Sequence, residues 1–213
     1  MFQLVLAFAL IALTNCQNIN PPIPMLAEDP GIIYNDRPGN RGKVRVDAFI
    51  ELNCPDSSAA WPMLKQVAEF YGRDDLELAV HQFSLPYHRN AFICTQGFYQ
   101  VADKAPESLW DYQEAVFANI LDYVGSINKD KSENDIVATL SALAEETTGI
   151  SAAEFASDID NYTGTAIYTW KYATRRGVSG TPWYMVNDID IGVNPSVRLT
   201  FQDWVDFLDP LIN

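Results

Sequence analysis

The spacing of apolar residues changes several times along the chain, and each spacing predicts one kind of secondary structure. Residues 43–52 form a run rich in β-branched and aromatic side chains, which is typical of a buried strand. From Ser57 to Tyr71 the apolar residues recur at steps of three and four, so one face of a helix is apolar. Residues 76–83 predict a second strand. Together these elements predict a βαβ unit with a parallel pair of strands.

A long block with only helical spacing follows the second strand. Ser132 and Asp135 have the spacing of a capping box, and Gly149 is placed to end the same helix. We therefore expect residues 85–176 to be an all-helical insertion of about four segments, at residues 90–104, 107–124, 132–147 and 151–170.

Strand character returns after the helical block. Trp183 to Val186 predicts a strand, and Asn187-Asp188 predicts a hairpin turn before a further strand over residues 189–193. Thr200 is placed to cap a final helix that carries its own apolar face. The order β, α, β, helical block, β, β, α predicts an α/β fold.

The pattern divides the chain into four parts. The uncharged start contains an apolar run followed by small residues, which predicts a secretory signal peptide cleaved near Cys16. The next part is rich in Pro, Asn and Gly and predicts an extended segment. The predicted parts are a signal peptide at residues 1–16, an extended segment at 17–42, one α/β domain formed by 43–84 and 177–213, and a helical domain at 85–176.

Composition and charge narrow the classes of function. The chain is 48% hydrophobic with a formal net charge of -14. This charge argues against binding nucleic acid or an anionic membrane, because both need clustered Lys and Arg. The N-terminal apolar run is too short to span a bilayer, so we expect a protein of the secretory lumen or the exterior that leaves the membrane after cleavage. The sequon at Asn161 predicts a glycan there.

Cys54 is the strongest candidate for chemistry. Residues 53–56 interrupt the first strand pattern before the first helix begins, so this cysteine lies at a strand-to-helix turn. The first amides of a helix lack intrahelical partners and carry partial positive charge, which favours a thiolate over a thiol. We therefore expect Cys54 to be a nucleophile.

This turn, together with a Gly-Thr-Pro loop before the third strand, resembles the thioredoxin fold in its DsbA-like form. Residues 54–57, Cys-Pro-Asp-Ser, match the first three places of that family's Cys-x-x-Cys motif. Pro62 matches the proline that kinks the active-site helix. The resemblance implies a thioredoxin fold with a helical insertion between the second and third strands, and a cis-proline pair facing the cysteine. The substrate-binding residues that it implies are Pro55, Asp56, Thr181 and Pro182.

Ser57 departs from the family pattern because it stands where the second cysteine would be. Without a resolving thiol, an outside thiol must release the substrate from its mixed disulfide with Cys54. Ser57 could donate a hydrogen bond to the Cys54 thiolate, whereas the charge of Asp56 opposes the thiolate. The catalytic residues implied are Cys54 and Ser57, acting on peptide or glutathione disulfides with no cofactor and with glutathione as a candidate co-substrate.

Two interpretations of Cys94 remain open. It lies among apolar residues of a predicted helix, where a small buried side chain is its commonest role. Alternatively, Cys94 pairs with Cys54 as an unusual resolving or locking partner. Spacing in the sequence does not bring the two sulfurs within bonding distance.

The remaining polar and aromatic candidates are expected to be structural. His81 and His88 have no third group at metal spacing, so no metal site is predicted. Five tryptophans fall on predicted apolar faces, where core packing is expected. They are Trp61, Trp110, Trp170, Trp183 and Trp204. Trp61 and Trp183 are also candidates to line a groove near Cys54.

Two other classes of function fit the same fold. A kappa-type glutathione transferase would place a serine near the start of the first helix and bind glutathione beside the Thr181-Pro182 loop. A non-enzymatic peptide-binding or chaperone-like module would keep the groove and lose redox turnover. The leading hypothesis is thiol–disulfide exchange by Cys54 acting as a monothiol. For this activity and for the binding module, the expected partners are disulfide-containing or unfolded peptides. Function depends on the site, so the fold does not choose among the three.

Overall fold

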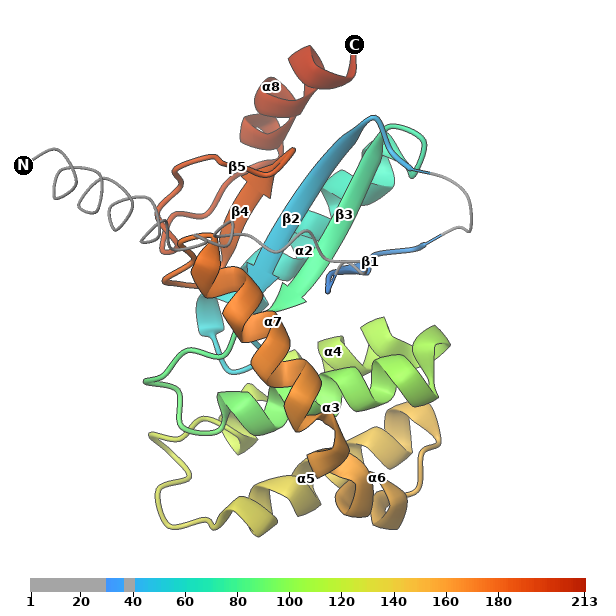
Figure 1. Ribbon diagram of the computed structural model, residues 1–213, viewed down its shortest axis with the longest axis vertical. Coiled ribbons are helices and arrows are strands. Elements are labelled where there is room, and N and C mark those ends of the chain that lie inside the picture. The colour runs from blue at the N-terminus through green and yellow to red at the C-terminus, as the bar shows by residue number, and fades with distance from the viewer. Residues whose placement is uncertain (1–29, 37–40) are drawn as a thin grey trace, which may run out of the picture.

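The computed structural model describes residues 30–36 and 41–213, which form a five-stranded sheet with helices on both faces (Figure 1). The predicted signal peptide at residues 1–16 and most of the predicted extended segment lie outside the described residues. Within the described ranges, no helix has the length and apolar character needed to cross a membrane.

The sheet has the strand order β1-β3-β2-β4-β5. β2 and β3 pair in parallel, which confirms the predicted βαβ unit, and every other pairing is antiparallel. The strands are β1 (Ile32–Ile33), β2 (Val44–Ile50), β3 (Leu76–Gln82), β4 (Trp183–Val186) and β5 (Ile189–Asp190).

The two edge strands differ from the expectation. β1 lies in the segment for which no regular element was predicted, and it pairs with the edge of β3. β5 ends at Asp190 rather than Val193, and Gly192 follows it with a φ of 69°. The predicted hairpin turn is confirmed, because Asn187 and Asp188 both have positive φ, at 49° and 66°.

The helices follow the predicted segments with two interruptions. The predicted helix over residues 107–124 is shorter than expected, because 3-10 turns at Pro106–Ser108 and Ile120–Asp122 flank its α-helical part. The predicted helix over 151–170 is broken by a 3-10 turn at Ile159–Tyr162. The capping boxes predicted at Ser132 and Thr200 are both present. The α-helices are α2 (Pro55–Tyr71), α3 (Ala91–Lys104), α4 (Leu109–Ala118), α5 (Glu133–Thr148), α6 (Ala152–Asp158), α7 (Thr163–Arg175) and α8 (Phe201–Ile212).

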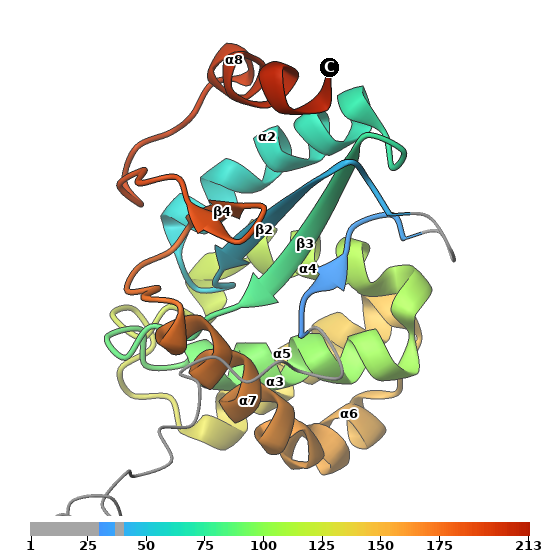
Figure 2. The same ribbon diagram turned by 45° about the horizontal axis from the view of Figure 1, so that its top comes forward.

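Side chains alternate across β2 and so define two faces of the sheet. Val44, Val46, Ala48 and Ile50 belong to the main core, which includes residues of α2 and α8. Phe49 belongs to a second cluster, with Ala173 of α7 and Met185 of β4 among its members. Figure 2 shows the corresponding layers, with α2 and α8 on one side of the sheet and α7 on the other.

The helical block between β3 and β4 shares the main core with the sheet. Apolar residues of α3, α4 and α5 belong to the same cluster as those of β2 and β3. Trp61 and Trp204 are buried as predicted. Trp170 is instead 39% exposed on α7, because α7 starts a new helix after the 3-10 turn at residues 159–162.

Candidate functional site

Cys54 is the N-cap residue of α2, at the turn where β2 leads into the helix. Its backbone N–H donates to the Glu51 carbonyl at 3.1 Å, and its own carbonyl accepts from the Ser58 N–H at 3.0 Å. Pro55 occupies the first helical turn, where the N–H that proline lacks would have had no intrahelical partner. These contacts fix the backbone on both sides of Cys54, and its side chain makes no capping hydrogen bond.

The loop before β4 lies against the Cys54 sulfur. The antiparallel pairing of β2 with β4 places Phe49 opposite Trp183, which brings residues 179–182 beside the start of α2. The Cys54 thiol donates to the Thr181 carbonyl at 3.3 Å. The Thr181–Pro182 peptide bond is cis, in agreement with the sequence prediction.

A groove of about 400 Å³ opens over this contact. Cys54 is only 4% exposed, so the groove is its route to solvent. Of the predicted substrate-binding residues, Pro55, Asp56 and Thr181 line the groove, whereas Pro182 is not among its lining residues. Its other walls come from the β3–α3 loop (Leu85, Tyr87, His88) and from Ser179, Gly180, Trp183, Asn194, Pro195 and Ser196.

Ser57 does not contact the Cys54 sulfur in the way the sequence suggested. It is completely buried, and its hydroxyl oxygen accepts from the Glu51 backbone N–H at 3.2 Å. No hydrogen bond joins Ser57 to Cys54 within the described part of the chain. The first turn of α2 directs this side chain toward the end of β2, so its hydroxyl stabilises the turn between the strand and the helix.

Cys94 is a buried free thiol and is not bonded to Cys54. Its sulfur donates to the Asn53 side-chain oxygen at 3.2 Å. Complete burial, with a smaller contribution from Glu51, raises the pKa of the Cys94 thiol far above its ordinary value. The structure therefore favours the interpretation of Cys94 as a small core side chain and gives no disulfide between the two cysteines.

Glu51 and His88 form a pair beside the groove that the sequence pattern did not single out. The Glu51 side chain is fully buried, and both of its oxygens lie close to His88 Nδ1, at 2.8 and 3.0 Å. Burial raises the pKa of Glu51 to about 9, despite a hydrogen bond from the Leu85 backbone, and burial lowers the pKa of His88. A charged residue at the apolar end of β2 was the available signal, but its partner comes from a loop 37 residues away.

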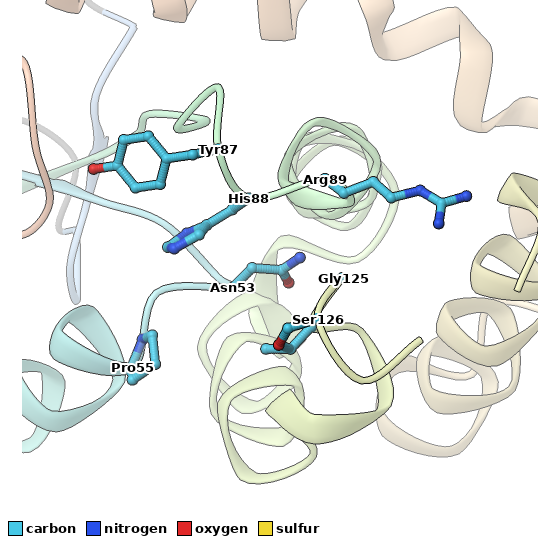
Figure 3. Close-up of a pocket in the computed structure, with 8 residues that line it drawn as sticks. Asn53, Pro55, Tyr87, His88, Arg89, Gly125 and Ser126 are labelled. Carbon is cyan, nitrogen blue, oxygen red and sulfur yellow. The ribbon is translucent and has the colours of Figure 1, made fainter. Parts of the chain in front are cut away.

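His88 is shared by three cavities. Besides the Cys54 groove, it lines a cavity of about 560 Å³ with Asn53, Tyr87 and Arg89 (Figure 3). It also lines an apolar hollow of about 430 Å³ between the β3–α3 loop and α7, where Ile167 is one of the walls. Figure 3 shows the His88 ring directed into the cavity beside Asn53, whereas the Arg89 side chain extends away from both.

The other predicted site features have simpler positions. His81 is fully buried and bonds Asp47 at 2.7 Å, so it is a core residue. Trp183 lines the Cys54 groove as expected, but Trp61 does not, because it is buried against Trp110 at a ring distance of 5.5 Å. Asn161 is exposed, and its glycosylation stays a prediction. No group of three or more potential metal ligands occurs within residues 30–36 and 41–213.

Comparisons with known proteins identify solved structures with the same fold. No protein-family model matches the sequence, and no curated protein is significantly similar to it. A putative protein-disulfide isomerase from Pseudomonas syringae is 22% identical, with a TM-score of 0.69 over 79% of this chain and 95% of that one. BdbD from Bacillus subtilis is 15% identical, with a TM-score of 0.66 over 86% and 93%.

A third solved structure is the thiol-disulfide oxidoreductase MdbA from Actinomyces oris, which is 16% identical, with a TM-score of 0.62 over 85% of each chain. These identities are low, so the likeness concerns the fold. The strand order, the helical block between β3 and β4 and the cysteine at the start of α2 agree with it. The chain therefore has the thioredoxin fold in its DsbA-like form.

Proposed function

We propose that this protein carries out thiol–disulfide exchange as a monothiol, with Cys54 as its nucleophile. The observation that carries the proposal is the Cys54 sulfur, which lies at the N-terminus of α2, 3.3 Å from the Thr181 carbonyl, in an open groove. Unpaired amides at a helix start stabilise a thiolate, and the thiolate is the form that attacks disulfides. The solved structures that share the fold include a thiol-disulfide oxidoreductase.

Observations at the two places where a second sulfur could lie support the proposed monothiol character. Position 57 carries a buried serine whose oxygen is held by the Glu51 N–H. Cys94 is completely buried, and its raised pKa disfavours the thiolate needed for attack. An intramolecular resolving step therefore has no sulfur to perform it among the described residues.

The reaction then runs in two exchanges. The Cys54 thiolate attacks one sulfur of a substrate disulfide, forms a mixed disulfide and releases the other sulfur as a thiolate, which takes up a proton. An external thiol, for which glutathione is the candidate, then attacks the substrate sulfur of the mixed disulfide and regenerates the Cys54 thiolate. We expect the substrates to be disulfide-containing or unfolded peptides, because residues 179–181 line the groove together with Cys54 and their backbone could pair with an extended peptide.

We place this reaction in the secretory lumen or outside the cell. The predicted signal peptide supports that location, and disulfide substrates persist in such oxidising compartments. Expression of the full chain with its native N-terminus in a secreting cell, followed by mass analysis of the medium, tests both cleavage near Cys16 and a glycan on Asn161.

The direct test is reaction of the mature chain with glutathione disulfide. We expect one glutathionyl adduct per molecule, located on Cys54 by peptide mass mapping and removed by added thiol. Cys54→Ser should give none, and Cys94→Ala, as the matched removal of the other cysteine, should give the same single adduct. Absence of an adduct on Cys54, while free cysteine reacts under the same conditions, would remove the enzymatic function.

A non-enzymatic peptide-binding role is the second candidate, and one observation favours it. Cys54 is only 4% exposed, while Ile167 and Trp170, beside the neighbouring apolar hollow, are 41% and 39% exposed. Binding of an unfolded reduced peptide that is unchanged in Cys54→Ser would support this role. Nothing in the site favours a kappa-type glutathione transferase, because the hydroxyl of Ser57 is buried and bonded to Glu51.

A further inference from the structure

The Glu51 and His88 pair is a buried acid joined to a half-exposed base, and the exchange chemistry described above does not use it. Both backbone polar groups of Glu51 form hydrogen bonds with the turn that carries Cys54. Its N–H donates to Ser57 Oγ at 3.2 Å, and its carbonyl accepts from the Cys54 N–H at 3.1 Å. Its carboxyl reaches His88 Nδ1 at 2.8 Å, so one residue links the nucleophile's backbone to the imidazole.

His88 lies where the Cys54 groove and two neighbouring cavities meet. Nδ1 faces the buried carboxyl, and Nε2 is on the opposite side of the ring, with no hydrogen bond recorded for it within the described part of the chain. The residue lines the Cys54 groove and both neighbouring cavities. A group leaving from a disulfide held on Cys54 must depart through this shared space.

The burial of Glu51 sets the direction of the hydrogen bond. A carboxyl without a cation partner is disfavoured as an anion inside the protein, and its pKa of about 9 keeps it protonated at neutral pH. A protonated Glu51 would donate its O–H to His88 Nδ1, and the proton of a neutral ring would then be on Nε2. The pair would then hold two protons, one on Nε2 and one on the buried carboxyl.

We propose that Glu51 and His88 form a proton relay that protonates the thiolate leaving from a disulfide attacked by Cys54. This inference rests on the proposed exchange reaction and names the acid in it. As the sulfur–sulfur bond breaks, the leaving thiolate takes the proton from Nε2, and the Glu51 proton passes to Nδ1, which leaves a neutral imidazole and a carboxylate. When the external thiol arrives, it gives its proton to Nε2, Nδ1 returns its proton to Glu51, and the new thiolate attacks the mixed disulfide.

The relay would serve a monothiol more than a dithiol enzyme. In a dithiol enzyme the resolving thiolate is supplied by the protein, whereas here each of two exchanges brings in or releases an outside thiol. Departure of a basic alkyl thiolate is slow unless it is protonated or otherwise stabilised, because leaving-group rate falls as thiol pKa rises. His88 would be the catalytic acid, and Glu51 would be a positioning residue that acts through it.

The test uses two disulfides of the same peptide that differ only in the leaving thiol. One carries an alkyl thiol of ordinary pKa, and the other carries a nitro-substituted aryl thiol that leaves as a stable anion. We expect His88→Gln to slow mixed-disulfide formation on Cys54 by roughly 100-fold with the alkyl leaving group and less than about twofold with the aryl one. Glu51→Gln keeps a donor to Nδ1 but holds no transferable proton. We expect it to slow mixed-disulfide formation by about tenfold with the alkyl leaving group and to leave the rate with the aryl leaving group unchanged.

Controls separate the relay from a structural role. Glu69→Gln removes an exposed carboxylate from the same helix as Cys54 and should leave both rates unchanged. His88→Ala should regain rate with the alkyl disulfide when imidazole is added. Equal losses with both leaving groups, or no loss in any variant, would overturn the relay. Failure of wild-type Cys54 to react with either disulfide would instead overturn the exchange reaction itself, and the relay with it.

Discussion

The structure contains two histidine–carboxylate pairs with nearly the same hydrogen-bond length, and the pKa of the carboxyl is shifted in opposite directions in the two. His81 lies 2.7 Å from Asp47 inside the sheet, and His88 lies 2.8 Å from Glu51 at the groove. Burial alone would raise the pKa of Asp47, but hydrogen bonds from His81 and Arg45 outweigh it and hold that pKa below its ordinary value. Among residues 30–36 and 41–213 no arginine forms an ion pair with Glu51, and burial raises its pKa to about 9.

The difference teaches that the charge state of a buried acid depends on whether a permanent cation accompanies it. Arg45 bonds Asp47 at 2.8 Å and Glu77 at 3.0 Å, so the Asp47 carboxylate is compensated. The His81 ring also stacks against Phe49 and Tyr172, at ring distances of 4.6 and 5.3 Å. The Asp47 pair is therefore part of the core, whereas the raised pKa of Glu51 favours the protonated acid that the proposed relay needs.

Breaking the core pair should have the largest effect on stability. We expect Asp47→Asn to lower the free energy of unfolding by about 3 kcal/mol at pH 7, because Arg45 loses a buried counter-charge. Since the pKa of Asp47 is lowered in the folded state, its contribution is present above its ordinary value of 3.8 and disappears as the pH falls below it. Urea unfolding at several pH values measures this.

An exposed aspartate provides the matched control. Asp160→Asn should change stability by less than about 0.5 kcal/mol, because the side chain lies on the surface. A small loss in Asp47→Asn, equal to that of the control, would contradict the view of this pair as a compensated core network.

The two cysteines should also differ in reactivity, because Cys54 lines the groove and Cys94 lies in the core. We expect iodoacetamide to modify Cys54 at least about 100-fold faster than Cys94 in the folded protein, since buried structural thiols are inert. Cys94 is fully buried with a raised pKa, whereas Cys54 lines the groove. Time-resolved peptide mass mapping gives both rates. Similar rates that persist without unfolding would show that the groove does not expose Cys54 selectively.

Replacing Glu51 should change how the free energy of unfolding depends on pH. The pKa of Glu51 in the folded protein lies above its ordinary value of 4.5, so its favourable contribution to stability is complete below pH 4.5 and is lost as the pH rises toward 9. Between pH 5 and pH 9 we expect the wild type to lose stability on the order of 5 kcal/mol more than Glu51→Gln does, because the raised pKa spans about four units at about 1.4 kcal/mol each. Parallel pH profiles for the two proteins would place the Glu51 carboxylate in a compensated environment, as for Asp47. Glu69→Gln should keep the wild-type profile.

The smallest expected effect concerns the hydrogen bond between Ser57 of α2 and the Glu51 backbone. Ser57→Ala removes the acceptor for the Glu51 N–H and should cost about 1 kcal/mol in unfolding free energy. If Ser57 only braces the turn, the rate of Cys54 glutathionylation should fall by less than about threefold, within the range of a small local shift. A loss of rate much larger than the loss of stability would return Ser57 to the catalytic role that its position in the sequence suggested.

Local patterns in the sequence were sufficient for the elements and for the position of the nucleophile. The β-branched and aromatic run of β2 and the apolar face of α2 are local patterns, and they place Cys54 at the junction of the two elements. The capping boxes at Ser132 and Thr200 involve residues three apart, so they too are local. The Thr181-Pro182 loop was found through its resemblance to a family motif, and pairing of β4 with β2 brings it to the sulfur.

Contacts between distant segments decided the rest. β1 has two residues and exists because the edge of β3 offers unpaired backbone groups, which no local pattern records. Ser57 faces Glu51 rather than Cys54 because of the rotation of the first turn of α2. The sequence alone thus determined which thiol stands at a helix start. Only the tertiary structure decided which carboxyl is buried without a cation and which histidine meets it, because desolvation and pairing depend on packing.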